Sequence, residues 1–417
     1  MFNMKKFVKN SFALINLQVF SYLIPLIIIP YLIRVLGVNQ FGIYAFAQAV
    51  CGYLYLVGSY GFHIKGVQRI ARAKDCGKDL CDIYSEITTA RLFLIFVCFI
   101  LLVFYCSQIP ENEAATVLII AVSGVSDIFC AHWFFLGLGN VKVHARIIIM
   151  SKVLYLFGIL LFVHEESDII IAAAVYTTSS LVSAIFTVFY LRTRLNLKYR
   201  ICSLASMIHS LRDGWSIFVA SLSTSTFRIL PLVVLGTIFK GEAVVGHFAI
   251  ADSISKAATR IIQPISQAAL PFSSQKFSKG GGIHLEYFKF LCKVYLAVGA
   301  ILSILLYFLA PQFIHFFSGK YIAESEWFLM LLSPIPLVVA ITNLFGIQIM
   351  TSTGNDREYG YILMVCGVAG ITICTLLYCQ KNIFLAPLAT LLPEFISAIL
   401  TVVFFKYKIR AILFKSI

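Results

Sequence analysis

Apolar stretches of about 20 residues recur from one end of this chain to the other, separated by short charged or turn-forming segments. A helix of about 20 residues spans the hydrocarbon core of a bilayer, which is roughly 30 Å thick. The 417 residues are 60% hydrophobic and only 12% charged, whereas about half of the residues of a soluble protein are apolar. The pattern therefore predicts an integral membrane protein.

Twelve of these stretches are predicted to be transmembrane helices, which makes the fold class all-α. They lie near residues 11–33, 41–63, 87–107, 114–137, 146–164, 169–191, 214–238, 243–270, 291–313, 326–350, 359–379 and 384–405. The connecting segments are too short to hold a soluble domain, so an enzyme acting in the aqueous phase is not expected. They also lack the spacings typical of metal or nucleotide sites, and neither a metal nor a cofactor is expected.

The formal net charge of +14 could indicate nucleic acid or an acidic membrane surface as a partner, and its distribution favours the membrane. Of the 33 Lys and Arg residues, 26 fall in the two tails and the even-numbered loops, if four residues close to span ends are counted with the adjoining loops, namely Arg91, Arg146, Lys152 and Lys293. Positive charge gathers on the cytoplasmic side of membrane proteins. Both termini are therefore predicted to be cytoplasmic, in a multi-pass membrane protein that does not bind nucleic acid.

A weak internal repeat appears when the chain is shifted by 204 residues. Gly37, Gly42 and Gln48 then fall on Gly241, Gly246 and Asp252, with small residues matching between them. Repeats of the same orientation place a substrate site at their interface. We therefore expect two pseudo-symmetric six-helix lobes, residues 1–200 and 201–417, around a central cavity.

A polar stripe crosses the predicted span at 243–270. At 100° per residue its members fall within an arc of roughly 80°; they are Asp252, Lys256, Arg260, Gln263 and Gln267. A charge at the centre of a bilayer costs about 2.5–3.5 kcal/mol even on the lenient insertion scale, so such residues face protein or water rather than lipid. The stripe is interpreted as the wall of a transport pathway.

Three more charges lie inside predicted spans, namely Arg228, Asp127 and Glu394. The cations Arg228, Lys256 and Arg260 are the groups that bind phosphate best, since guanidinium forms paired hydrogen bonds and ammonium acts as a compact charge. An alternative is that these cations and the carboxylates simply neutralise one another, in which case the charges are structural.

Three segments of the sequence resemble the O-antigen flippases (Wzx), which are polysaccharide transporters of the multidrug/oligosaccharidyl-lipid/polysaccharide superfamily. They read LQVFSYLIPLIIIPYLIRVLGVNQFGIYAFAQA, DIFCAHWFFLGLGNVKVHARI and VVGHFAIADSISKAATRIIQPISQAALPF, and a later pattern is formed by Pro311, Gly319 and Tyr321. The resemblance implies a flippase that moves undecaprenyl-pyrophosphate-linked O-antigen units from the cytoplasmic to the periplasmic leaflet of the bacterial inner membrane. It also implies alternating access, coupling to a proton or sodium gradient, and an O-antigen polymerase and a chain-length regulator as candidate partners.

The resemblance and the polar residues together define the expected site. Its substrate-binding set lines the cavity and comprises Arg228, Lys256, Arg260, Gln263, Gln267, Gln48, Asn16 and Gln18. Ion coupling or charge balance is expected at Asp252, Asp127 and Glu394. The main alternative is a multidrug/cation antiporter of the same superfamily, which would need a cavity dominated by acidic residues. A membrane polymerase or ligase would need a large periplasmic loop, and a scaffold would need no buried polar stripe.

Overall fold

The computed structural model describes residues 4–76, 80–200, 202–277 and 285–409, and throughout these ranges the chain forms helices and short connections without strands. The all-α prediction is confirmed. Packing divides the chain into two compact units, Met1–Ser221 and Leu222–Ile417. Helix α8 (Leu204–Arg228) contributes its first part to one unit and its end to the other. Whether these units are the two predicted lobes, with a boundary near residue 200, stays a prediction.

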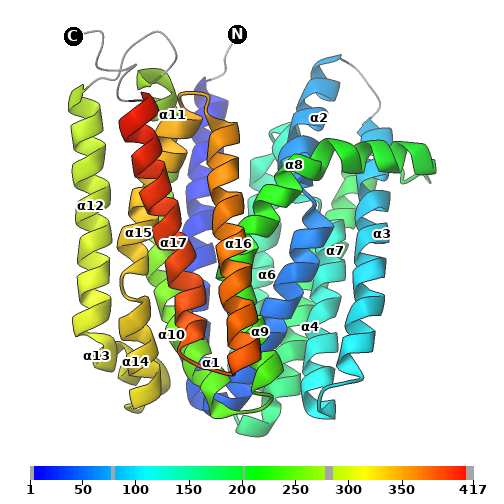
Figure 1. Cartoon of the computed structure of the whole chain (residues 1–417). Helices are drawn as coiled ribbons and strands as arrows, with labels where there is room; N and C mark the ends of the chain where they lie inside the picture. Colours follow the sequence, from blue (N-terminus) through cyan, green and yellow to red (C-terminus); the bar gives the residue numbers. More distant parts are fainter. Residues whose placement is uncertain (1–3, 77–79, 201, 278–284, 410–417) are drawn as a thin grey trace. The chain divides into compact units, whose positions relative to one another are not determined.

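The N-terminal unit is built from long helices that run side by side (Figure 1), with α4 packed between α1 and α7. Besides the first part of α8, it contains α1 (Met4–Ser59), α2 (Phe62–Cys76), α3 (Leu80–Cys106), α4 (Glu111–Cys130), α5 (His132–Leu138), α6 (Val141–Phe162), the short turn η1 (Glu166–Asp168) and α7 (Ile169–Arg194).

The C-terminal unit has more short helices, because several of its predicted spans are broken. Helix α12 packs on α15, α16 on α17, and α10 on α14. The elements are α9 (Leu230–Ile238), α10 (Ala243–Arg260), α11 (Ile262–Lys276), α12 (Leu285–Phe308), α13 (Ala310–Ser318), α14 (Ala323–Leu332), α15 (Ile335–Thr342), η2 (Asn343–Thr351), α16 (Asp356–Gln380), α17 (Leu385–Phe404) and η3 (Phe405–Ile409).

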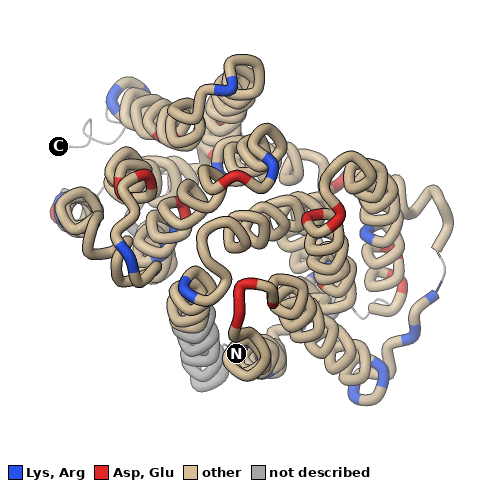
Figure 2. Tube along the Cα trace, turned by 90° about the horizontal axis from the view of Figure 1, so that it is seen from below, with Lys and Arg blue, Asp and Glu red and all other residues tan. Residues whose placement is uncertain are grey.

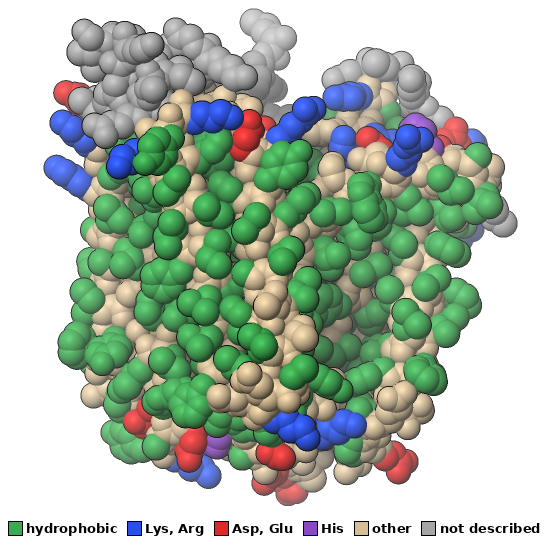
Figure 3. Space-filling model, viewed as in Figure 1, with side chains coloured by type: hydrophobic (Ala, Val, Ile, Leu, Met, Phe, Trp, Pro, Cys, Tyr) green, Lys and Arg blue, Asp and Glu red, His purple; other side chains and the backbone are tan. Residues whose placement is uncertain are grey.

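In both units the side chains along the middle of the helices are hydrophobic, and charged side chains gather near the helix ends (Figure 3). Large apolar groups such as Phe96, Phe104 and Phe189 are 64–68% exposed. Viewed along the helices, most of the trace likewise carries no charge (Figure 2). In water such exposure would be costly, and it is the pattern expected of helices surrounded by lipid.

Nine helical stretches in the described part of the chain are long and apolar enough to span a membrane, or ten if α8 and α9 form one bent span. One stretch, Leu23–Ala73, covers two predicted spans, because α1 continues through a kink at Gly37. The predicted span at 243–270 does not qualify, since its polar stripe lowers its hydropathy. The protein is therefore a multi-pass helical membrane protein, and the count of twelve stays a prediction.

The kink at Gly37 has a counterpart at the position predicted by the repeat. Gly37 has φ 70°, and Gly241 has φ 67°. Only glycine adopts this left-handed conformation without steric cost, so each position turns the chain into the helix that follows. Tyr44 and Phe248, also equivalent in the repeat, are each 1% exposed. These matches agree with the proposed repeat.

Candidate functional site

A cavity of about 550 Å³ lies within the C-terminal unit. It is lined by residues of α8, α10, α11, α15, η2, α16 and α17. Sites for small ligands usually measure about 300–1,000 Å³. The cavity could hold a charged headgroup with an adjoining sugar, but not a long oligosaccharide.

The polar stripe lines this cavity along its whole length. Asp252, Lys256 and Arg260 lie on α10, and Gln263 and Gln267 lie on α11. The helix is interrupted at Ile261, whose N–H donates to the carbonyl of Ala258 at 3.1 Å instead of continuing the α-helical pattern. Despite this interruption, all five side chains of the stripe line the same cavity, as the sequence periodicity predicts.

Arg228 reaches the cavity at the end of α8, where the chain bends by 51° into α9. The preceding turns are held against α16 by a close approach: a Cβ on Gly367 would lie 3.0 Å from the Cα of Ser223. Thr226 also donates a hydrogen bond to the carbonyl of Gly367 at 3.1 Å. The absence of a side chain at Gly367 therefore fixes the position from which Arg228 projects.

Two of the three cavity cations are paired with carboxylates. The Nε and Nη2 atoms of Arg228 donate to the same oxygen of Glu394 at 2.9 and 2.8 Å, and neither bond uses Nη1. Lys256 pairs with Asp252, one helical turn earlier on α10. Both carboxylates are buried, at 3% and 7% side-chain exposure, while Arg228 and Lys256 are 47% and 41% exposed. In each pair, therefore, the carboxylate is buried and the cation is exposed.

The side chain of Arg260 forms neither an ion pair nor a hydrogen bond with any described residue, and it is exposed to the cavity. The described lining holds three cations and two carboxylates, hence one net positive charge. Polar groups that sequence reasoning missed complete the lining, among them Asn343, Tyr359 and Thr390. Their occurrence in otherwise apolar spans is a signal that could have identified them.

Asp127 lies in the N-terminal unit, where it forms a separate cluster. Its carboxylate accepts a hydrogen bond from Arg91 Nη2 at 2.7 Å and approaches His132 Nε2 at 3.2 Å. His132 Nδ1 in turn lies 3.3 Å from His144 Nδ1. Counting Arg91 with a cytoplasmic loop was wrong, since it lies inside α3 with a side chain only 4% exposed.

The remaining predicted residues are not part of the C-terminal cavity. Gln48 lies on α1 in the N-terminal unit, next to the buried hydroxyl of Tyr44. Tyr44 shares a hydrogen bond of 2.7 Å with Tyr155. Asn16 and Gln18 lie near the start of α1, in a stretch whose side chains are outside the described residues. A substrate-binding role for these three residues stays a prediction.

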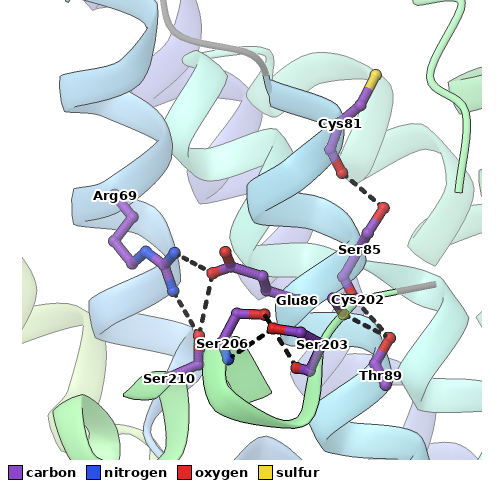
Figure 4. A network of polar contacts seen from close by, with 9 residues as sticks. All are labelled: Arg69, Cys81, Ser85, Glu86, Thr89, Cys202, Ser203, Ser206 and Ser210. Atoms are coloured by element: carbon purple, nitrogen blue, oxygen red, sulfur yellow. Dashed lines mark hydrogen bonds and ion pairs between the residues drawn. The ribbon is translucent and has the colours of Figure 1, made fainter. Parts of the chain in front are cut away.

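A third polar cluster, also in the N-terminal unit, ties the start of α8 to α2 and α3 (Figure 4). Arg69 on α2 pairs with Glu86 on α3, and both contact the hydroxyl of Ser210 on α8, at 2.8 Å from Arg69 and 3.2 Å from Glu86. A second bond joins Cys202 Sγ to Thr89 Oγ1 at 3.1 Å. Since α8 also carries Arg228, this cluster holds the far end of the helix that reaches the cavity.

Comparisons with known proteins complement this geometry. A family model described as "Polysaccharide biosynthesis protein" matches residues 7–277. Two relatives carry the name "Putative O-antigen transporter": that of Escherichia coli (strain K12) is 27% identical over 395 residues, covering 94% of this chain and 92% of the relative. That of Shigella dysenteriae is 26% identical over 362 residues, covering 84% and 87%.

A solved structure described as the inward-facing conformation of a multidrug resistance MATE family transporter of the MOP superfamily has a similar fold. Its TM-score is 0.62, and the match covers 95% of this chain and 100% of that one. The sequence identity is 14%, so this likeness concerns the fold alone.

Proposed function

Because the chain belongs to the polysaccharide biosynthesis protein family, we propose that it transports a lipid-linked polysaccharide precursor, with the pyrophosphate bound in the cavity of the C-terminal unit. Specifically, it would flip undecaprenyl-pyrophosphate-linked O-antigen units from the cytoplasmic to the periplasmic leaflet of the inner membrane by alternating access. The observation that carries the proposal is the net positive cavity inside an apolar helical unit. The relatives' names support the same substrate class.

Arg260 is the expected first contact for the pyrophosphate. No carboxylate among the described residues competes for its guanidinium, which can bind two phosphate oxygens at once. Lys256 would then exchange Asp252 for phosphate, since its ammonium group is 41% exposed. Arg228 would offer its remaining Nη1 atom while buried Glu394 holds the guanidinium in place.

The sugars and the lipid have different requirements. Amide and hydroxyl groups such as those of Gln263, Gln267 and Asn343 line the same cavity and can bond to sugar hydroxyls. The prenyl chain needs no polar cavity and can remain in the bilayer during transport. The pyrophosphate is thus the part of the substrate that most needs protein groups to replace its water.

A multidrug/cation antiporter is the alternative from the same superfamily. A cationic substrate would meet a cavity with one net positive charge, in which both carboxylates are already bound by cations. It would have to displace Arg228 or Lys256 to reach an anionic partner. The charge balance therefore favours an anionic headgroup.

The substitution Arg260→Gln tests this proposal in a strain that lacks its own O-antigen flippase. A hydrogen bond to a charged group contributes about 1.5–3 kcal/mol, so the variant should lower surface polysaccharide by about tenfold or more at equal membrane levels. Arg357→Gln is the matched control, because Arg357 is exposed at the start of α16 and does not line the cavity. Normal surface display with Arg260→Gln would refute the assigned site, and failure of the unmodified chain to complement would refute the function.

A further inference from the structure

A break between α4 and α5 places a titratable cluster at a bend inside the N-terminal unit. Helix α4 ends at Cys130, α5 begins at His132, and Ala131 between them has φ 44° and ψ 41°. This left-handed conformation is unfavourable for alanine, so the surrounding contacts must hold it. His132 is the first residue after the bend, and its contacts to Asp127 and His144 connect α5 to α4 and α6.

The hydrogen bonds define the protonation state of this cluster when both histidines are neutral. Asp127 is paired with Arg91, and as a carboxylate it can only accept hydrogen bonds, so His132 Nε2 is assigned as the donor to it. A neutral His132 with its proton on Nε2 has a bare Nδ1. His144 Nδ1, at 3.3 Å, is then the donor to that atom. In this assignment, Nε2 of His144 remains as the nitrogen without a proton.

The contacts that the structure describes link the two histidines to one charged pair, Arg91 and Asp127. Arg91 of α3 is the only cation among the described groups that contact Asp127, apart from His132 itself. The other titratable groups that interact with Asp127 are Tyr55 of α1, Tyr176 of α7 and Cys51 and Cys130. His144 packs its ring against Phe135 at 6.1 Å. The Arg91–Asp127 pair is neutral, so an imidazolium would be the one uncompensated charge in this cluster.

We propose that Asp127, His132 and His144 form a proton-binding site at the α4–α5 bend, in which the two imidazoles share one added proton. The incoming proton binds Nε2 of His144, and the proton in the hydrogen bond between His144 Nδ1 and His132 Nδ1 can then reside on either nitrogen, so the positive charge is shared by the two rings. A role of this site in driving transport rests on the proposed function, whereas proton binding itself does not.

Proton binding changes the electrostatic interactions where α4 meets α5. It places a positive charge near Arg91, in a region where Arg91 and His144 are almost fully buried. Repulsion in such a low-dielectric region favours a conformation in which the imidazoles gain water. The side chain of His132 is 32% exposed, which gives the pair contact with the surroundings. Because the two protonation states prefer different conformations, proton binding shifts the population at the bend.

A metal ion is a competing occupant of the same region. Ligand atoms of Asp127, Cys130 and His132 lie within 4.8 Å of one another. Each is already engaged, however: Asp127 binds the permanently charged Arg91, Cys130 Sγ donates to Ser183 Oγ at 3.6 Å, and His132 contacts Asp127 and His144. A divalent cation would have to bind beside a guanidinium. The geometry therefore favours a proton.

Trp133, which follows His132 directly, provides a readout independent of transport. The chain has 3 Trp residues, so the double substitution Trp215→Phe and Trp327→Phe leaves Trp133 as the only one. The indole of Trp133 is only 3% exposed and packs against Tyr84. The more hydrated conformation that protonation favours should therefore cause a drop in its emission as the pH falls from about 8 to about 4 with a chelator present. Adding His132→Gln or His144→Gln should abolish the drop. His164→Gln, at an exposed site on the same chain, should retain it.

Two outcomes of the titration would overturn the proton site. One is a drop that persists in both His132→Gln and His144→Gln. The other is a signal that appears only when zinc is added and is lost with chelator, which would identify a metal site. His132→Gln changes a partly exposed side chain, so the test does not depend on the folding of the His144 variant.

Transport by purified protein in vesicles separates this inference from the proposed function. With labelled undecaprenyl-pyrophosphate oligosaccharide as the probe, an imposed pH gradient should raise the rate for the unmodified chain. In His132→Gln the ratio of rates with and without the gradient should fall to about one, since the gradient then shifts no equilibrium. If the unmodified chain moves no substrate, the proposed function fails and the fluorescence titration still decides on proton binding. A gradient effect that survives in His132→Gln overturns the coupling role.

Discussion

Both units bury a carboxylate that is paired with an arginine, and the two arginines differ in their exposure. In the N-terminal unit, Arg91 is 4% exposed and Asp127 16%. In the C-terminal unit, Glu394 is 3% exposed but Arg228 is 47% exposed, because the pair lines a cavity. Both members of the first pair are thus largely shielded, whereas the second pair presents its cation to a ligand.

The comparison shows that an ion pair inside a membrane protein can serve two purposes. An enclosed pair makes a buried charge tolerable and links helices, although replacing both partners by apolar groups can cost little. A pair with one exposed partner keeps that partner oriented and available. The sequence alone cannot distinguish these situations, since each charge occurs in an apolar span in the same way.

The largest expected effect comes from opening the enclosed pair. Asp127→Leu leaves the Arg91 guanidinium buried without its counterion, which should lower the free energy of unfolding by about 3–5 kcal/mol. The midpoint of thermal unfolding in detergent measures this loss. The double variant Arg91→Met with Asp127→Leu should recover most of it, because no charge is then left unpaired. If Asp127→Leu were as stable as the unmodified chain, Arg91 would not be buried with Asp127 as its required counterion.

For the Arg228–Glu394 pair, loss of the arginine and loss of the carboxylate should have different effects on stability. Arg228→Gln leaves Glu394 buried and unpaired, whereas Glu394→Gln leaves Arg228 in contact with water. The first substitution should therefore destabilise the protein more than the second, by about 1–2 kcal/mol. The same unfolding measurement compares the two variants directly. A reversed order would mean that Arg228 is the buried partner in the membrane.

The smallest stability effect is expected at Asp252. Its partner Lys256 is 41% exposed, so Asp252→Asn should change the free energy of unfolding by less than about 1 kcal/mol. Releasing Lys256 should also strengthen the binding of inorganic pyrophosphate severalfold, corresponding to about 1 kcal/mol, as measured by titration calorimetry. Weaker binding in this variant would show that Asp252 positions Lys256 for the ligand instead of competing with it.

Much of the architecture could be predicted because its signals are local. Apolar stretches of sufficient length predict helices in a membrane, and they are found as helices throughout the described ranges. The stripe from Asp252 to Gln267 depends only on the 3.6-residue period, and its residues do line one cavity. The family resemblance is confirmed by the match over residues 7–277.

The partners of the charges could not be predicted in the same way. Arg228 and Glu394 are 166 residues apart, and Arg91 and Asp127 are 36 apart. His144 contacts His132 across the packing of α5 against α6. Such contacts arise from helix packing, which the composition of a single span does not encode.

The amino-acid sequence by itself determined that this protein is helical, lies in a membrane and carries a polar face on one interrupted span, because hydropathy and helical period are properties of neighbouring residues. Only the tertiary structure decided which cations are held by carboxylates, which one remains available in the cavity, and where two histidines meet. The reason is physical: the cost of a buried charge depends on what lies within a few ångströms of it, and packing brings those groups from distant parts of the chain.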